Sequence, residues 1–122
     1  MLKPKHLMTG LLLASAALPS LGVCAEDAVI ADPKHYTLEF ENDRVRVIRA
    51  TYGPHEKSVM HTHGPNVAVF LSNGKVRFTL PDGSAVEATQ EVGSIEWADA
   101  EEHLPENLTD QPLEVLLVEL KD

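Results

Sequence analysis

The sequence MHTHGPNVAVFLSNG, residues 60–74, joins two histidines, an apolar run and a turn dipeptide. In an extended strand, side chains two residues apart point to the same face, so His61 and His63 project together while Thr62 faces away. A metal site needs at least one further ligand, and His103, beyond a second group of predicted strands, is the candidate. Two solvated histidines on a surface strand are the alternative interpretation.

The rest of this region also predicts strands. Residues 67–71 and 75–80 flank Asn73-Gly74, a strong β-hairpin signal. Pro81-Asp82-Gly83-Ser84 predicts the next turn. The run 115–118 is apolar on both faces, as expected of an inner strand covered by a second sheet. Further strands are predicted at residues 85–90, 94–97 and 113–120.

Two strands are predicted upstream. Residues 35–41 alternate with period two, which places Tyr36, Leu38 and Phe40 on one face. A second strand, residues 44–52, changes its alternation at Val47-Ile48, and a bulge or bend there is the simplest explanation. No window after residue 25 shows helical periodicity. Short strands separated by turns indicate an all-β sandwich or barrel.

The first 25 residues have the parts of a cleaved secretory signal peptide. Two lysines precede an apolar stretch at residues 11–18, and Val23-Cys24-Ala25 supplies a small-residue cleavage site. The apolar stretch is too short to favour a membrane span. We therefore expect a mature chain that begins at Glu26 and is periplasmic or secreted. A lipid anchor on Cys24 is the alternative.

Composition limits the function. The 122-residue chain has a formal net charge of −9, and cleavage after Ala25 would remove two lysines and the only cysteine, leaving a charge of −11. The mature chain could then form neither a disulfide nor a thiolate metal site. Its acidic balance argues against nucleic acid and anionic lipid as partners, so a small-molecule ligand is expected.

The mature chain should have two parts. Residues 26–34 are small and acidic, and Pro33 discourages a helix, so we expect a flexible lead-in. Residues 35–122 are enough for one compact domain with its own core.

The motifs resemble those of the cupin superfamily, whose members are small jelly-roll β-barrels. The resemblance runs from about Tyr36 to Leu120. Asp99 and Glu101 stand where the family usually has proline and glycine, and Val67 stands where it has its metal-binding glutamate. The residues that carry the resemblance are, in order, Gly53, His61-Thr62-His63, Gly74, Gly93, His103 and Asn107.

The resemblance implies metal ligation by His61, His63 and His103, without a carboxylate. Neutral imidazoles suit transition metals and leave positions open for water or substrate, so the divalent ion could be iron, zinc, nickel, copper or manganese. Three neutral ligands leave the ion with more positive charge than a set that includes a carboxylate, which favours an anionic substrate. Thiol dioxygenases of the superfamily are similar in using three histidines.

Other residues near the motifs allow two interpretations. His55 could be a fourth ligand but is better interpreted as a loop histidine, and Glu56 as a solvated charge. Glu101 and Glu102 could fix the tautomer of His103 by hydrogen bonding, or belong to a surface acidic run.

Inward positions of a small barrel make Phe78, Leu80 and Trp97 candidates to line a cavity, although Trp97 also suits a core position. Asn107-Leu108-Thr109 matches a glycosylation sequon, but Asn107 is expected to end a strand, so the match carries no weight.

Three functions remain open. The first is a secreted cupin with a three-histidine metal centre and oxygen-dependent, dioxygenase-like or isomerising chemistry on a small anionic molecule. The second is a non-enzymatic module that binds a small molecule with or without metal. The third is a structural cupin with a filled barrel. The resemblance also implies a homodimer.

Overall fold

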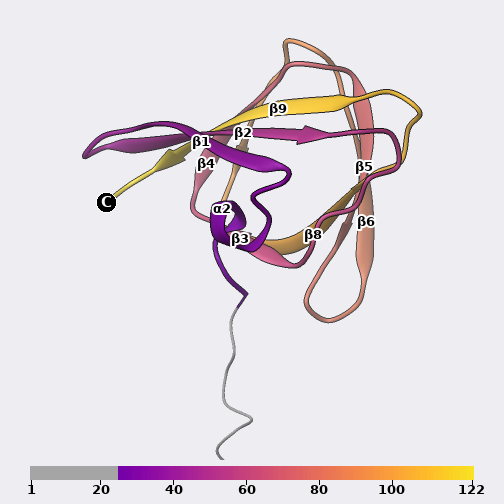
Figure 1. Ribbon diagram of the computed structural model, residues 1–122, viewed down its shortest axis with the longest axis horizontal. Coiled ribbons are helices and arrows are strands. Elements are labelled where there is room, and N and C mark those ends of the chain that lie inside the picture. Colours follow the sequence, from indigo (N-terminus) through magenta and orange to yellow (C-terminus); the bar gives the residue numbers. More distant parts are fainter. Residues whose placement is uncertain (1–24) are drawn as a thin grey trace, which may run out of the picture.

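The computed structural model describes residues 25–122, which form an all-β domain of two antiparallel sheets (Figure 1). The five-stranded sheet has the order β1-β2-β9-β4-β7, and the four-stranded sheet has the order β3-β8-β5-β6. The all-β prediction is confirmed, and the hydrogen bonding of these residues gives two separate sheets, not a closed barrel. The strands are β1 (Tyr36–Glu41), β2 (Val45–Tyr52), β3 (His61–His63), β4 (Asn66–Phe70), β5 (Gly74–Thr79), β6 (Ala85–Gln90), β7 (Ile95–Ala98), β8 (Glu101–Asn107) and β9 (Leu113–Leu120).

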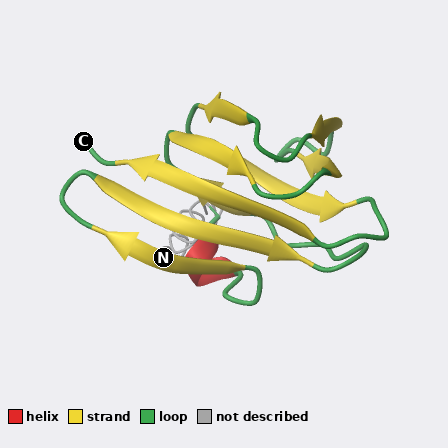
Figure 2. Ribbon diagram, turned by 90° about the horizontal axis from the view of Figure 1, so that it is seen from above, coloured by secondary structure: helices red, strands yellow, loops and turns green. Residues whose placement is uncertain are grey.

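The core lies between the sheets and comes mainly from alternate residues of the five-stranded sheet. Ile48, Ala50 and Tyr52 on β2 point inward, as do Leu113 and Val115 on β9. Ile48 is completely buried, which stabilises the fold by about 1.5–3 kcal/mol relative to an exposed side chain. The long strands of this sheet run side by side in Figure 2.

The last strand has the central position that its apolar run predicts. β9 pairs with β2 on one side and with β4 on the other. Its inward residues face the core, while Leu116 and Val118 are half-buried on the outer face. The period-two alternation of β9 also carries an inward carboxylate, Glu119, to the end of the strand.

The prediction of a hairpin at Asn73-Gly74 is wrong. β4 pairs with β7 and β9, whereas β5 pairs with β6 and β8, so the chain crosses from one sheet to the other here. Gly74 is required by close packing: a Cβ atom at this position would lie 2.1 Å from Leu113 Cδ1. Asn73 Oδ1 instead accepts a hydrogen bond from the Val92 amide at 2.8 Å.

The true hairpin is the next one along the chain. β5 and β6 pair antiparallel along their whole length, and the turn predicted at 81–84 joins them. Gly83 has a φ of 90°, a left-handed conformation that glycine adopts without the steric cost of a side chain.

The irregularity predicted at Val47-Ile48 on β2 lies instead on the neighbouring strand β1. β2 pairs with β9 without interruption, but the register of β1 against β2 shifts between Leu38 and Phe40. The extra residue is Glu39. It puts Phe40 opposite Val47 on the outer face, so Leu38 and Phe40 do not share a face as expected, and Phe40 is 53% exposed.

The segment expected to be a flexible lead-in contains a short helix, α2 (Ala28–Ala31), near β1 and β3 (Figures 1 and 2). Asp27 caps this single turn and also binds Arg46, and Ala28 is completely buried. A helix of one turn is too short to show a helical periodicity, so no sequence pattern indicated it. Within residues 25–122 no helix is long and apolar enough to cross a membrane. Residues 1–24 of the expected signal peptide lie outside the described residues.

Candidate metal centre

Three histidines meet at the edge of the four-stranded sheet. His61 and His63 lie on the same face of β3, and His103 lies directly opposite His61 on the neighbouring strand β8. All three are buried, and one potential ligand atom from each lies within 4.8 Å of the other two. The structure therefore brings together the three residues proposed from the sequence.

Hydrogen bonds hold one nitrogen of each β3 ring. His61 Nδ1 lies 2.8 Å from the Val59 carbonyl oxygen, which can only accept, so Nδ1 carries the proton. His63 Nδ1 lies 3.1 Å from Glu119 Oε2, a carboxylate that accepts in the same way. In both rings the lone pair therefore belongs to Nε2, and this is the usual arrangement of a metal-binding imidazole whose other nitrogen is held by the protein.

The third ring has the same arrangement. His103 Nδ1 lies 3.3 Å from Glu101 Oε1, while His103 Nε2 is buried and has no hydrogen-bond partner. The Phe78 ring stacks on the imidazole at a centroid distance of 4.9 Å and helps to fix its orientation. A buried polar atom without a partner costs about 1–3 kcal/mol, and a metal ion would remove that cost.

The spacing of the nitrogens suits a cation. His61 Nε2 and His63 Nε2 are 3.1 Å apart, and with both protons on Nδ1 their lone pairs face each other. Two nitrogens bound to one zinc-like ion at about 2.0–2.1 Å, with an angle of about 90–110° between the bonds, lie roughly 2.8–3.4 Å apart. The donor set therefore fits a divalent transition-metal ion.

The electrostatics favour a neutral His61 ring. Burial, followed by the neighbouring His63 and His103, lowers the pKa of His61 to about 3. His61 is thus deprotonated at neutral pH, as a metal ligand must be.

Val67, at the sequence position of the family's glutamate, faces away from the histidines. It pairs with Trp97 and Val118 on the outer face of its sheet, whereas the next residue, Ala68, lines the inner cavity that His63 also lines. A carboxylate at position 67 would not reach the site. The neighbouring positions that line the cavity are Asn66 and Ala68, and neither supplies a carboxylate.

Glu119 is a functional residue that the sequence analysis missed. It is 4% exposed and holds His63, and Arg46 Nη1 lies 3.9 Å from its other oxygen. The sequence held a sign of this role, because Glu119 continues the inward series of residues 113, 115 and 117, which is otherwise apolar.

Comparison with solved structures identifies the fold. No family model and no curated protein matches the sequence. A cupin domain from Bordetella pertussis Tohama I is 22% identical, with a TM-score of 0.67 over 83% of this chain and all of the other. The chain has the cupin fold. A cupin protein from Methanocaldococcus jannaschii is 18% identical over 73% of this chain and 83% of its own, with a TM-score of 0.54.

Two enzymes are also similar to this cupin fold. Oxalate decarboxylase is 26% identical over 66% of this chain, with a TM-score of 0.52, and the match spans only 22% of that protein. The polyketide cyclase RemF from Streptomyces resistomycificus is 18% identical over 71% of this chain and 64% of its own, with a TM-score of 0.52.

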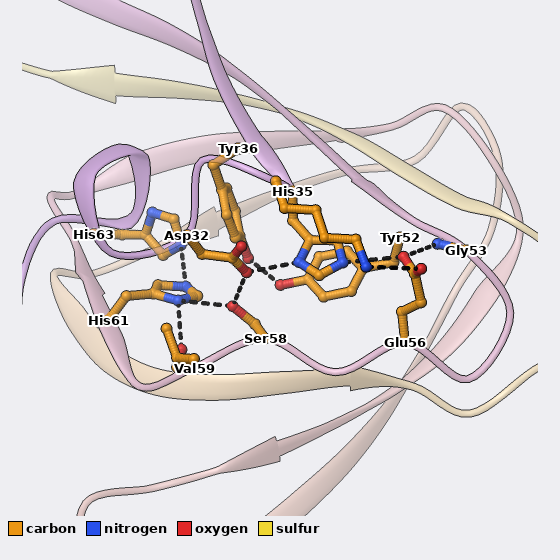
Figure 3. A network of polar contacts seen from close by, with 11 residues as sticks. Asp32, His35, Tyr36, Tyr52, Gly53, Glu56, Ser58, Val59, His61 and His63 are labelled. Carbon is orange, nitrogen blue, oxygen red and sulfur yellow. Dashed lines mark hydrogen bonds and ion pairs between the residues drawn. The ribbon is translucent and has the colours of Figure 1, made fainter.

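A fourth buried histidine, His35, lies beside the metal-centre candidates but has different hydrogen-bond partners (Figure 3). His35 Nδ1 lies 2.6 Å from Asp32 Oδ2, and His35 Nε2 lies 3.0 Å from Glu56 Oε1. The ring also stacks on Tyr52 at 4.4 Å. Both nitrogens face carboxylates, which matches a doubly protonated ring without a free lone pair.

Asp32 joins the two histidine clusters. Ser58 Oγ donates to Asp32 Oδ2 at 2.5 Å and lies 3.3 Å from His61 Nδ1 (Figure 3). Burial raises the pKa of Asp32, but the hydrogen bonds from Ser58 and His35 outweigh burial and hold the pKa below its usual value. Glu56 is not the solvated charge expected from the sequence. Its hydrogen bonds from the Gly53 amide, then His35 and Lys34, lower its pKa to about 2.

Between the sheets of this cupin fold lies a cavity of about 210 Å³, with His63 and His103 in its wall. Phe78 and Trp97 line it as predicted, but Leu80 does not. Trp97 is 55% exposed and is not a core residue.

The remaining candidates fall outside the centre. His55 is a loop histidine as interpreted: its side chain is 59% exposed and binds Asp110 at 2.6 Å. Glu101 contacts His103, whereas Glu102 pairs with Thr62 along the strand. Asn107 is completely buried, so the sequon is inaccessible.

Proposed function

We propose that this protein is a periplasmic or secreted cupin that binds a divalent transition-metal ion through Nε2 of His61, His63 and His103. The observation that carries the proposal is the shared arrangement of the three rings. Each has a partner at Nδ1, and the unpartnered Nε2 of His103 is buried beside the others.

When bound, such an ion would supply Lewis-acid or redox chemistry to a small molecule in the adjoining cavity. The protein's own contribution is to hold and shield that molecule. The cavity has a largely apolar wall, and Glu101, one of the two carboxylates that line it, could accept a proton. Burial is the largest single influence and raises the pKa of Glu101, but the hydrogen bond with His103 and the interactions with the three histidine rings together outweigh burial and hold the pKa below its usual value.

Elemental analysis tests the metal proposal. Protein purified under mild conditions should contain about one equivalent of a transition metal, or take up one equivalent of added iron, zinc, nickel, copper or manganese. A protein that refuses all five ions would contradict the proposal and favour a binding module without metal.

Oxygen uptake tests the chemistry. Metal-loaded protein that consumes oxygen with small thiols, diketones or hydroxy acids would be an oxygenase, which is the first activity to test. Tight binding of such compounds without turnover would favour the non-enzymatic binding function, for which the largely apolar cavity is the supporting observation.

The homodimer is a separate proposal, supported by the outer face of the five-stranded sheet. Phe40 on β1 and Ile95 and Trp97 on β7 are 53%, 65% and 55% exposed, at opposite edges of that face. Half-buried Val67 and Val118 lie between them. Sedimentation equilibrium should show a dimer that Trp97→Lys weakens, and a wild-type monomer at high concentration would contradict this proposal.

A further inference from the structure

The cavity beside the three histidines offers no positive side chain to a ligand. Among the described residues, its wall contains neither lysine nor arginine, and its two acidic residues are Glu96 and Glu101. A ligand with two or more negative charges would meet these carboxylates with only the metal ion to balance it. Burial of an uncompensated charge is costly, so the wall selects against dianions.

The size of the cavity limits the ligand to about one ring. A dry cavity of about 150 Å³ in another protein accommodates benzene. The cavity here has a volume of about 210 Å³, which leaves room for one six- or seven-membered ring with small substituents. Fused polycyclic compounds would need the sheets to separate.

Aromatic side chains make the end of the cavity nearest the histidines suitable for a flat ligand. Phe78 stacks on His103 at 4.9 Å, and Tyr36 meets His61 edge-on at 4.8 Å. Both residues line the cavity, and flat rings pack favourably against such walls.

A polar amide, that of Gln90, lines the cavity away from the histidines. Gln90 is 7% exposed and pairs with Gly74 at the start of β5, whereas Leu104, next to His103, pairs with Thr79 at the end of β5. Gln90 Nε2 donates to the Ser72 carbonyl at 2.9 Å. The cavity thus has polar groups away from the histidines as well, while most of its lining residues are apolar.

We propose that the ligand is a planar monocyclic compound with two adjacent oxygen donors and at most one negative charge, of the catechol, tropolone or hydroxypyranone class. The oxygen pair would bind the metal and the ring would occupy the apolar part of the cavity. The metal contact rests on the function proposed above, but the selection for one ring and low charge rests on the cavity alone.

Tropolone and oxalate test this selection directly. Both chelate a metal through two oxygens, but tropolone carries a ring and one charge whereas oxalate carries two charges and no ring. Trp97 borders the cavity but shares the outer face of its sheet with Val67, so isothermal titration calorimetry, and not tryptophan fluorescence, should measure the two affinities. Metal-loaded protein should bind tropolone at least tenfold more tightly than oxalate, with metal content checked after each titration. Equal or tighter binding of oxalate would overturn the proposal.

Two neighbours on β4 provide a matched pair of variants. Ala68 lines the cavity and Val67 faces the opposite side of the sheet. Ala68→Phe should fill the cavity and weaken tropolone binding at least tenfold at unchanged metal content, whereas Val67→Phe should leave it within about twofold. Equal effects of the two variants would overturn the assignment of the ring to the cavity.

Metal-free protein separates this inference from the proposed function. If the protein binds no metal, phenol should still enter the cavity, and Ala68→Phe should abolish its binding. The absence of metal would reject the metal centre, and phenol binding that is lost in Ala68→Phe would still support the selection of a single ring by the cavity. Failure of the metal-free protein to bind phenol, together with no preference of metal-loaded protein for tropolone, would reject the ligand class, while bound metal would still support the centre.

Discussion

The two buried histidine clusters lie side by side and differ in how the ring nitrogens are used. His61 and His35 are both almost fully buried, at 0% and 4% exposure. His61 has a partner for Nδ1 and presents Nε2 to two other histidines. His35 has a carboxylate at each nitrogen, Asp32 on one side and Glu56 on the other.

The difference shows that burial does not by itself mark a ligand. A buried ring whose two nitrogens are both satisfied by carboxylates is an ion pair that ties segments together, here residues 32, 35 and 56. A buried ring with one satisfied nitrogen and an unpartnered one nearby is prepared for a cation. The following experiments test whether this contrast governs the protein's behaviour, from the largest expected effect to the smallest.

Removal of His103 should have the largest effect. His103→Ala deletes a ligand, and because loss of residues that only orient ligands already costs about 10–100-fold in affinity, we expect a loss of more than about 100-fold. Isothermal titration with the best-bound metal measures it. Exposed His55→Ala is the control and should bind as the wild type does, and a His103→Ala protein of wild-type affinity would refute the three-histidine site.

Removal of His35 should lower the stability of the fold and leave the metal affinity almost unchanged. His35→Ala leaves Asp32 and Glu56 facing each other without their shared cation, so the free energy of unfolding should fall by about 2–3 kcal/mol. Urea denaturation of metal-free protein checks this. Metal affinity of the folded variant should stay within about threefold of wild type. A loss as large as that of His103→Ala would mean that His35 belongs to the metal site.

Glu119 tests the positioning of a ligand by a buried carboxylate. Glu119→Gln keeps an acceptor for His63 Nδ1 but removes the charge, and we expect metal affinity to fall by about tenfold. Glu114→Gln is the matched control, because Glu114 lies on the same strand and binds the half-buried Arg49 away from the histidines. Equal affinities of the two variants would show that the charge of Glu119 does not matter to the site.

The free energy of unfolding of metal-free protein should depend on pH, because the His61 imidazole is neutral in the folded state. His61 has a folded-state pKa of about 3 against about 6.5 unfolded, so between these values only the unfolded chain binds the proton. Stability should therefore rise with pH by up to about 1.4 kcal/mol per unit from this residue and level off above about 6.5. Urea unfolding between pH 5 and 7, where most carboxylates are ionised, should show a smaller slope in His61→Leu.

Strand periodicity was sufficient to predict part of this site. Two histidines at positions i and i+2 must share a face, and the order of turns and strands matched the family pattern that includes His103. The partners could not be predicted in the same way. Glu119 is 56 residues from His63, and only the pairing of β9 with β2 and β4 at the centre of its sheet brings the two together.

Prediction of the fold from the sequence had the same limit. Period-two patterns located most strands, but local turn chemistry did not determine which strands pair. Asn73-Gly74 has the composition of a hairpin turn, yet the glycine is there because Leu113, 39 positions away, occupies the space of its side chain. The His35 cluster also depends on such contacts, because Asp32 and Glu56 come from opposite sides of the β1–β2 pair in sequence.

The short stretch before α2 also protects the strand that carries two of the histidines. β3 is the edge strand of its sheet, and on its free side the Thr62 amide donates to the Glu26 carbonyl at 2.9 Å while Asp27 bridges Thr62 in parallel. Exposed strand edges are templates for pairing with other chains. A chain trimmed beyond Asp27 would present an open edge at its histidine strand, and two such chains could join there, edge to edge.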